Sequence, residues 1–141
     1  LIIEKKQKFV GAIHAGWKGA FKGIVKKTIQ LLKKNGCSEK DMIACIGPCI
    51  KKKNYEVKDD FFKLFKDKNK KNVNFFTFKK KKIYFDLSEY IKSQFYENGV
   101  KKIDIIRKDT FSLKNNFFSS RRSKKNKHND YGRNISAIMI K

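Results

Sequence analysis

The residue types best suited to chemistry stand near the start of the chain, in the run His14-Ala15-Gly16-Trp17-Lys18-Gly19. The apolar residues before it predict a short buried strand over 8–13, so His14 is expected at the rim of a sheet, where ligands usually dock. Its imidazole can bind a metal or exchange protons near neutral pH. Gly16 and Gly19 would let the backbone approach a ligand, and the N–H groups of a helix start can receive an anion. A hydrogen-bonded structural histidine is the alternative.

A second group of such residues comes late in the chain, where Ser119, Ser120, Arg121 and Arg122 follow two phenylalanines. Arginine and serine side chains together suit a phosphate or a carboxylate. We expect this segment to be extended, so neighbouring side chains point to opposite faces and only one of the two arginines reaches a given pocket. The alternative is a set of structural ion pairs, for which the candidate carboxylates are Glu56, Asp86 and Asp109.

The cysteines and the second histidine give weaker signals. Cys45 and Cys49 have a spacing that could bind a soft metal, but the chain has no second cysteine pair, which favours a core residue and a loop residue. Cys37 and His128 are expected in loops. Three cysteines form an odd set, which argues against a disulfide framework and for a reducing compartment, so a cytoplasmic location is expected.

Hydrophobic spacing predicts an α+β unit that holds these residues. The apolar positions from Trp17 to Leu32 predict one long amphipathic helix, ended by Asn35 and Gly36. No linker interrupts the pattern, so residues 1–141 are expected to form a single domain. The further expected elements are a strand over 42–46, a helix over 57–67, a hairpin of 74–78 and 82–87, a helix from Ser88 to Gly99, a strand over 103–106, extended pieces over 109–120, a polar loop over 121–133 and a strand over 135–140.

Composition excludes some classes of protein. The 141 residues include thirteen Phe, five Tyr and one Trp, which is too aromatic for a disordered chain. No apolar run approaches the roughly 18 residues of a membrane span. Lys+Arg 36 against Asp+Glu 13 gives a net charge of +23, but only four of these cations are Arg. Lys, Asn, Ile and Phe are enriched together, as AT-rich codons would produce. A solvated basic surface is therefore favoured, and a nucleic-acid or other polyanion surface is left open.

A series of motifs follows in a fixed order along the chain. They are the run 12–19, with Gly23 after it, and Ile46-Gly47-Pro48-Cys49-Ile50, Tyr55-Glu56-Val57, Phe85-Asp86-Leu87, Asp109-Thr110, Phe117-Phe118-Ser119-Ser120-Arg121-Arg122 and Tyr131-Gly132-Arg133. This order resembles a known family, the YfiH type, whose members are labelled multicopper polyphenol oxidoreductases (laccase domain), many of them described as purine nucleoside phosphorylases. The resemblance implies an α+β fold, a layered α/β/β/α domain of mixed sheets.

The same resemblance implies an active-site metal, usually zinc and in some members copper, held by two His and one Cys. His14 matches the second His ligand. The other two ligands belong to segments that lie, in the family, before the point where this chain begins, so we expect an N-terminally truncated, partial domain. Cys45 and Cys49 do not match the ligand Cys, and Ser120 stands where many members have Tyr.

The activity that the resemblance implies is metal-dependent cleavage of adenosine, inosine, guanosine or methylthioadenosine by phosphate, with deamination of adenosine by water. A three-ligand metal would leave a position open for water or phosphate and lower the pKa of bound water. His14 is the expected catalytic and metal-binding residue, and Arg121, Arg122 and Ser119 are the expected substrate contacts. Zinc is the expected cofactor, with copper possible, and a purine nucleoside and phosphate are the expected partners, without a membrane.

Three other interpretations stay open. Copper-dependent phenol oxidation ranks lower, because a single centre lacks the several coppers that such chemistry needs for oxygen. The net charge suggests a basic module that binds nucleic acid or another polyanion. The absence of two ligands suggests that these 141 residues alone are catalytically inactive, because one histidine binds zinc too weakly to fix its geometry.

Overall fold

The computed structural model describes residues 1–6, 9–128 and 131–140. Its contacts gather into two compact units, which we describe separately: unit 1 holds residues 1–47, 88–106 and 136–141, and unit 2 holds residues 48–87 and 107–135. Both combine helices and strands, as the predicted α+β class requires. The single domain predicted for residues 1–141 stays a prediction. Among the described residues, no helix has the length and apolar character needed to cross a bilayer.

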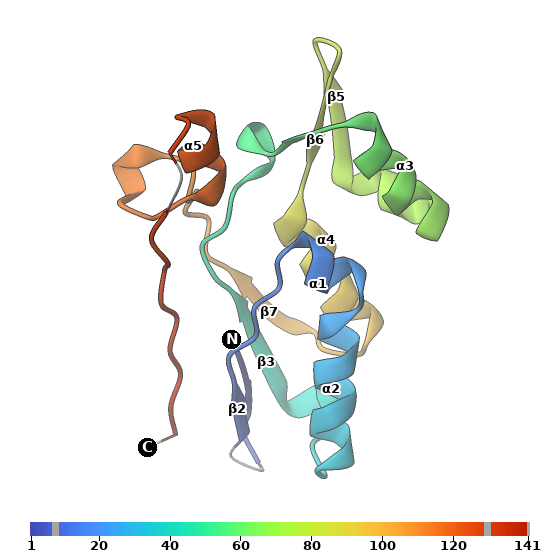
Figure 1. Cartoon of the computed structure of the whole chain (residues 1–141). Helices are drawn as coiled ribbons and strands as arrows, with labels where there is room; N and C mark the ends of the chain where they lie inside the picture. The colour runs from blue at the N-terminus through green and yellow to red at the C-terminus, as the bar shows by residue number, and fades with distance from the viewer. Residues whose placement is uncertain (7–8, 129–130, 141) are drawn as a thin grey trace. The chain divides into compact units, whose positions relative to one another are not determined.

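The sheet of unit 1 has four strands in the order β2-β1-β3-β7 (Figure 1). β1 pairs antiparallel with both β2 and β3, and β3 pairs parallel with β7. The strand predicted over 42–46 is confirmed, with alternate residues Met42, Ala44 and Ile46 buried. The strand predicted over 8–13 is shorter in the described part, and β1 was not predicted. The strands are β1 (Ile2–Glu4), β2 (Phe9–Gly11), β3 (Met42–Ile46) and β7 (Lys102–Ile105).

The long helix predicted from Trp17 is wrong in one respect, because two helices take its place. Gly23 has a φ of 80°, a left-handed conformation that ends one helix and begins the next. Apolar spacing is continuous across this break, since Ala20, Val25 and Ile29 are all buried. The predicted stop at Gly36 is confirmed, with a φ of 83°. The helices are α1 (Trp17–Phe21), α2 (Ile24–Lys34) and α4 (Leu87–Glu97).

Unit 2 is built on an antiparallel sheet in the order β4-β6-β5 and on one helix, α3. Phenylalanines fill its core: the ring centroids of Phe61 and Phe65 lie 4.6 Å apart, and those of Phe76 and Phe85 lie 4.9 Å apart. The predicted hairpin is confirmed, but residues 74–75 belong to a 3-10 helix rather than to its first strand. The elements are β4 (Glu56–Val57), α3 (Asp59–Lys68), η3 (Lys70–Phe75), β5 (Phe76–Lys79) and β6 (Lys82–Phe85).

The end of the chain differs most from the predictions. The polar loop predicted over 121–133 begins instead as the helix α5 (Ser120–Lys125), because the Ser119 hydroxyl accepts a hydrogen bond from the Arg122 N–H and caps it. Residues 129–130 of that loop lie outside the described part. The strand predicted over 135–140 joins no ladder among the described residues, and Ile135 and Met139 are 93% and 78% exposed. The strand was predicted from apolar residues along 135–140, and such a pattern does not show whether another strand lies beside it to pair with.

We predict that Gly23→Ala destabilises unit 1. Nothing lies within 4 Å of an added Cβ, so the penalty is conformational and should be about 1–2 kcal/mol in the free energy of unfolding. Gly23→Asn should lose less, because asparagine tolerates the left-handed region. Thermal or urea unfolding measures both, with Lys22→Ala as the control, since Lys22 has a negative φ and is exposed. An equal loss in Lys22→Ala would contradict this account of the break.

Candidate functional site

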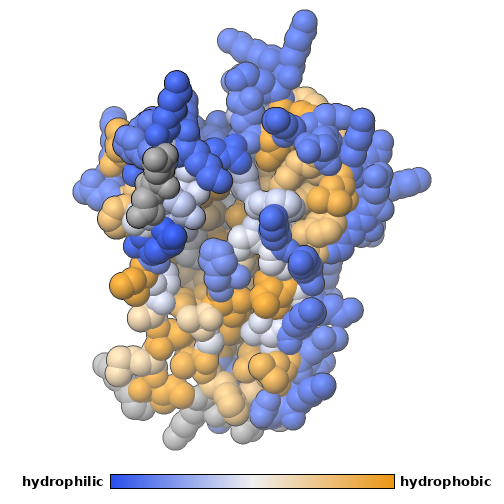
Figure 2. Space-filling model, in the orientation of Figure 1, coloured by the Kyte–Doolittle hydropathy of each residue, from blue (hydrophilic) through white to orange (hydrophobic). Residues whose placement is uncertain are grey.

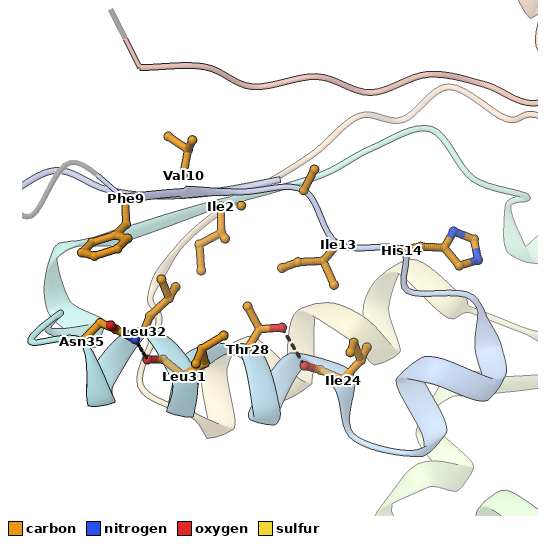
Figure 3. Close-up of a pocket in the computed structure, with 12 residues that line it drawn as sticks. Ile2, Phe9, Val10, Ile13, His14, Ile24, Thr28, Leu31, Leu32 and Asn35 are labelled. Carbon is orange, nitrogen blue, oxygen red and sulfur yellow. Dashed lines mark hydrogen bonds between the residues drawn. The ribbon is translucent and has the colours of Figure 1, made fainter.

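His14 lies on the segment that joins β2 to α1, as the sequence predicted, and its side chain is exposed. An apolar groove of about 490 Å³ runs between β2 and α2 and reaches His14 at one end. Figure 3 shows Ile13 and Ile24 in this groove and the imidazole of His14 pointing away from them. The ring is therefore accessible from outside the apolar groove.

The glycines after His14 hold the backbone close to its ring. A Cβ built on Gly16 would lie 3.1 Å from Nε2 of His14, closer than side chains normally allow. A Cβ on Gly19 would lie 3.5 Å from the His14 carbonyl oxygen, an ordinary contact. The imidazole itself has no hydrogen bond or ion pair with any described residue. The alternative of a hydrogen-bonded structural histidine therefore finds no support among those residues. Gly16 thus sets where the ring can lie.

The described residues do not by themselves fit the metal site that the resemblance implies. Among them, no group of three His, Cys, Asp or Glu side chains could hold an ion. Cys37 lies in the loop after α2, as predicted, and is buried there. Burial raises the pKa of its thiol, and the negative charge of Glu4 adds to that rise. Cys45 lies within β3, and the Cys49 sulfur accepts from Lys51 Nζ at 3.7 Å. His14 is one potential ligand, and no catalytic step follows from it alone.

Arg122 joins three segments of the end of unit 2. Its Nη1 donates to the carbonyl oxygens of Thr110 and Phe111 at 2.9 and 3.0 Å, and its Nη2 donates to the Phe117 carbonyl at 2.6 Å. A guanidinium is suited to this task because its N–H groups fan out in one plane. The side chain is half-buried. These bonds hold the 110–117 loop against α5.

Arg121 has different surroundings and is exposed. Its Nη1 donates to the carbonyl oxygen of Glu56 at 2.6 Å, and its guanidinium carbon lies 5.1 Å from the centre of the Tyr55 ring. Burial raises the pKa of the Tyr55 phenol, and the charge of Arg121 opposes that rise. The two adjacent arginines therefore contact different segments. The extended conformation predicted for them is wrong, because both lie in α5.

The carboxylates proposed as arginine partners bind elsewhere, which corrects the ion-pair alternative. Glu56 pairs with Lys82 at 2.9 Å, and Asp86 lies 3.7 Å from Lys52 Nζ. Asp109 is buried and accepts hydrogen bonds from the Asn54 side chain and from the backbone N–H groups of Lys51 and Phe111. The arginines bind backbone carbonyl oxygens instead, a type of contact that carries no sequence signature.

The segment 131–134 contacts Phe118, which the sequence did not reveal. The side-chain amide of Asn134 accepts from the Phe118 N–H at 3.0 Å and donates to the Phe118 carbonyl at 2.9 Å, as a neighbouring strand would. A Cβ on Gly132 would lie 2.5 Å from the Phe118 ring. A larger residue would displace the Phe118 ring, which gives Gly132 of the Tyr131-Gly132-Arg133 motif a structural reason.

The predicted site residues fall in the two units. His14 lies in unit 1, whereas Ser119, Arg121 and Arg122 lie together in unit 2, at the start of α5. Within unit 2, Arg121 contacts Tyr55 and Glu56, whereas Ser119 and Arg122 contact each other and Arg122 binds the 110–117 loop. The catalytic and binding roles predicted for these residues stay predictions.

Comparison with known proteins identifies one family and several relatives. The family model described as multi-copper polyphenol oxidoreductase laccase matches residues 1–141. A purine nucleoside phosphorylase of Rickettsia conorii is 37% identical over 137 residues, which make up 95% of this chain and 56% of that protein. One of Rickettsia prowazekii is 34% identical over 143 residues, 100% of this chain and 59% of that protein.

Two solved structures have a similar fold. The hypothetical protein YfiH of Bacillus licheniformis has a TM-score of 0.78 at 26% identity, over 87% of this chain and 48% of its own. A Neisseria meningitidis protein of the DUF152 family has a TM-score of 0.74 at 27% identity, over 86% and 49%. The predicted fold class and resemblance are confirmed. The chain spans about half the length of the relatives that it matches.

We predict that Gly16→Ala displaces the His14 imidazole without unfolding the protein, because the new Cβ would crowd Nε2. The Gly16 backbone, at φ −63° and ψ 167°, accepts alanine without strain. The matched control is Gly19→Ala, which should raise the free energy of unfolding by about 0.5–1 kcal/mol by removing a helical glycine, and should leave the ring in place. Imidazole NMR shifts and urea unfolding separate the two effects. Unmoved imidazole signals in Gly16→Ala would contradict the contact.

We also predict that Arg122→Ala destabilises unit 2 by about 2–4 kcal/mol, because it leaves three carbonyl oxygens without their charged donor. Arg122→Lys should recover little of this loss, since an ammonium cannot span the three acceptors. Arg121→Ala, which removes one carbonyl contact from an exposed side chain, is the matched control and should lose less than about 1 kcal/mol. Equal losses in the two alanine variants would refute the structural role of Arg122.

Proposed function

The chain belongs to the multi-copper polyphenol oxidoreductase laccase family, and on this premise we propose that it is part of a purine nucleoside phosphorylase. The observation that carries the proposal is the set of relatives with that name, 34–37% identical over nearly the whole of this chain. In the reaction a phosphate oxygen bonds to C1′ of the ribose while the bond from C1′ to the purine nitrogen breaks. The purine leaves with the electron pair of that bond and takes up a proton.

We assign His14 the role of the metal ligand and catalytic residue that this part of the protein contributes. The accessible imidazole, without a described partner and beside Gly16, supports this assignment. The described residues provide no complete ligand set, so the remaining ligands must come from outside them. The choice between zinc and copper belongs to the same proposal.

The pairing register of β1 indicates where residues that precede Leu1 in a longer product would lie relative to His14. Leu1 donates to and accepts from the Cys45 backbone, and Ile2 lies opposite Gly11 on the other side. Residues that precede Leu1 in a longer product would continue β1 between these neighbours. The second such residue would come opposite Gly47 and, if β2 also continued, opposite His14. Upstream residues would then lie beside the imidazole.

We further propose that Arg121 contacts phosphate or ribose. Its guanidinium is exposed and, among the described residues, donates to one carbonyl oxygen, that of Glu56, so several N–H groups stay available to an anion. Arg122 can add its charge to the same region while it holds the loop in place. Ser119 already accepts the Arg122 N–H as a helix cap, and its own hydroxyl proton can still be donated to a phosphate oxygen.

We also propose that the protein deaminates adenosine with water and that it is cytoplasmic. Phosphorolysis and deamination both act on a purine nucleoside with an oxygen nucleophile, which is phosphate in the first and water in the second. Cys37, Cys45 and Cys49 are thiols and not disulfides, which agrees with a reducing compartment. Copper-dependent phenol oxidation is the second candidate, and the family description is the observation that favours it.

The test is an assay of the full-length gene product with adenosine and phosphate. Release of adenine measures phosphorolysis, and formation of inosine measures deamination. We predict that His14→Ala lowers both rates about a hundredfold or more, as loss of a group that acts on the reaction should. His128→Ala is the matched control, an exposed histidine on the turn after α5, and should keep parental activity. A His14→Ala protein as active as the parent would remove the proposed role, and phenol oxidation without phosphorolysis would favour the second candidate.

A further inference from the structure

The hairpin of unit 2 ends in four consecutive lysines. Lys79 closes β5 and lies opposite Lys82 at the start of β6, with Lys80 and Lys81 as the two turn residues between them. All four side chains are exposed. The tip projects beyond α3 (Figure 1), and Figure 2 shows hydrophilic side chains over it.

This tip is unfavourable for stability in two ways. Lys80 and Lys81 have φ angles of 49° and 61°, in the left-handed region that a two-residue hairpin turn requires and that glycine or asparagine fills at lower cost. Lys79 and Lys82 are like charges directly opposite each other on antiparallel strands, which is also destabilising. A sequence selected for hairpin stability alone would not place four lysines here.

Codon composition does not explain these positions. Codons made only of A and T encode asparagine as well as lysine, and the chain has eleven asparagines. Outside the tip, Asn116 and Lys127 have a positive φ, of 55° and 58°, among the described residues other than glycine. The same bias would supply asparagine at 80 and 81 as readily as lysine, with a more stable turn.

Little negative charge lies near the tip to compensate it. Lys82 pairs with Glu56, which raises the pKa of that lysine. Within the described part of the chain, Lys79, Lys80 and Lys81 have no ion pair. Three cations thus stay available on one short loop, and their mutual repulsion would be relieved by a ligand that carries several negative charges.

An exposed aromatic ring adjoins the cations. Phe78 precedes Lys79, packs edge-on against Phe62 at 5.2 Å between ring centroids, and is still 59% exposed. Lysines next to an exposed ring are the combination by which proteins hold single-stranded nucleic acid, with cations on the phosphates and rings stacked on bases.

We propose that the β5–β6 hairpin tip, residues Phe78 to Lys81, is a binding surface for single-stranded nucleic acid. This surface does not depend on the nucleoside phosphorylase function. The lysines contact the phosphate backbone and Phe78 stacks on a base. Because the contacts are mostly electrostatic, the surface should bind with little sequence preference and with affinity that falls as salt rises.

The test uses the full-length gene product and a dye-labelled single-stranded RNA of 20 nucleotides, with binding followed by fluorescence anisotropy across a salt series. The double variant Lys80→Asn/Lys81→Gly removes two charges and installs the preferred turn residues, so it should fold at least as stably as the parent. We expect about tenfold weaker binding and a salt slope lower by about 1. The charge-matched control Lys26→Gln/Lys27→Gln, on the exposed face of α2, should change the affinity less than twofold.

Phe78→Ala tests the stacking contact. It should weaken binding of the single strand about fivefold or more and leave duplex binding unchanged, with a thermal melt to confirm folding. Equal losses in the two double variants would show diffuse charge and overturn the proposal, as would absence of binding at low salt. Binding of anionic vesicles or polyphosphate that responds to the hairpin variants as RNA does, with no effect of Phe78→Ala, would overturn the choice of nucleic acid.

Discussion

Unit 1 depends on the backbone pairing of β1. This three-residue strand lies between β2 and β3, and it is the one strand with which β2 pairs among the residues that the structure describes. Ile2 is buried, and Glu4 is buried at the other end of the same strand. Without β1, the segment Phe9–Gly11 would lose its ladder, and the position of His14 three residues later would no longer be fixed. The imidazole therefore owes its place to a strand whose own sequence contains no chemical motif.

Unit 2 is stabilised more by side-chain contacts than by strand pairing. Its sheet is short, and its stability comes from packed phenylalanines under α3. The segment from Arg107 onward contributes few strand hydrogen bonds, and the polar side chains of Asp109, Arg122 and Asn134 tie its backbone groups instead. These residues are buried or half-buried where they make those bonds, except Asn134, which is exposed. In this region, several residues of the motifs that carry the family resemblance make hydrogen bonds that hold a loop in its conformation.

How far the sequence could predict this structure depends on the kind of interaction. The strand over 42–46 was found because buried alternation is local, and the hairpin because two β-rich runs flank a turn. The break at Gly23 was missed because a residue's φ leaves no trace in apolar spacing. The α5 helix was missed because its cap, Ser119, stood in a motif that was interpreted as substrate-binding. The carbonyl partners of Arg122 could not be predicted, since every residue carries a carbonyl.

The same distinction applies to charge. A net charge of +23 is a property of the whole chain, and it fits a solvated surface as well as a binding one. A solvated surface and a binding surface can be told apart by the conformational free energy that each lysine costs at its own position. A lysine on the exposed face of α2 costs the helix almost nothing, so its presence there carries little information. A lysine at a positive φ displaces a residue that would fit better. Lys127 is one such residue, but only at the hairpin tip do two of them, Lys80 and Lys81, adjoin each other within the described part of the chain, and there the charge supports a partner.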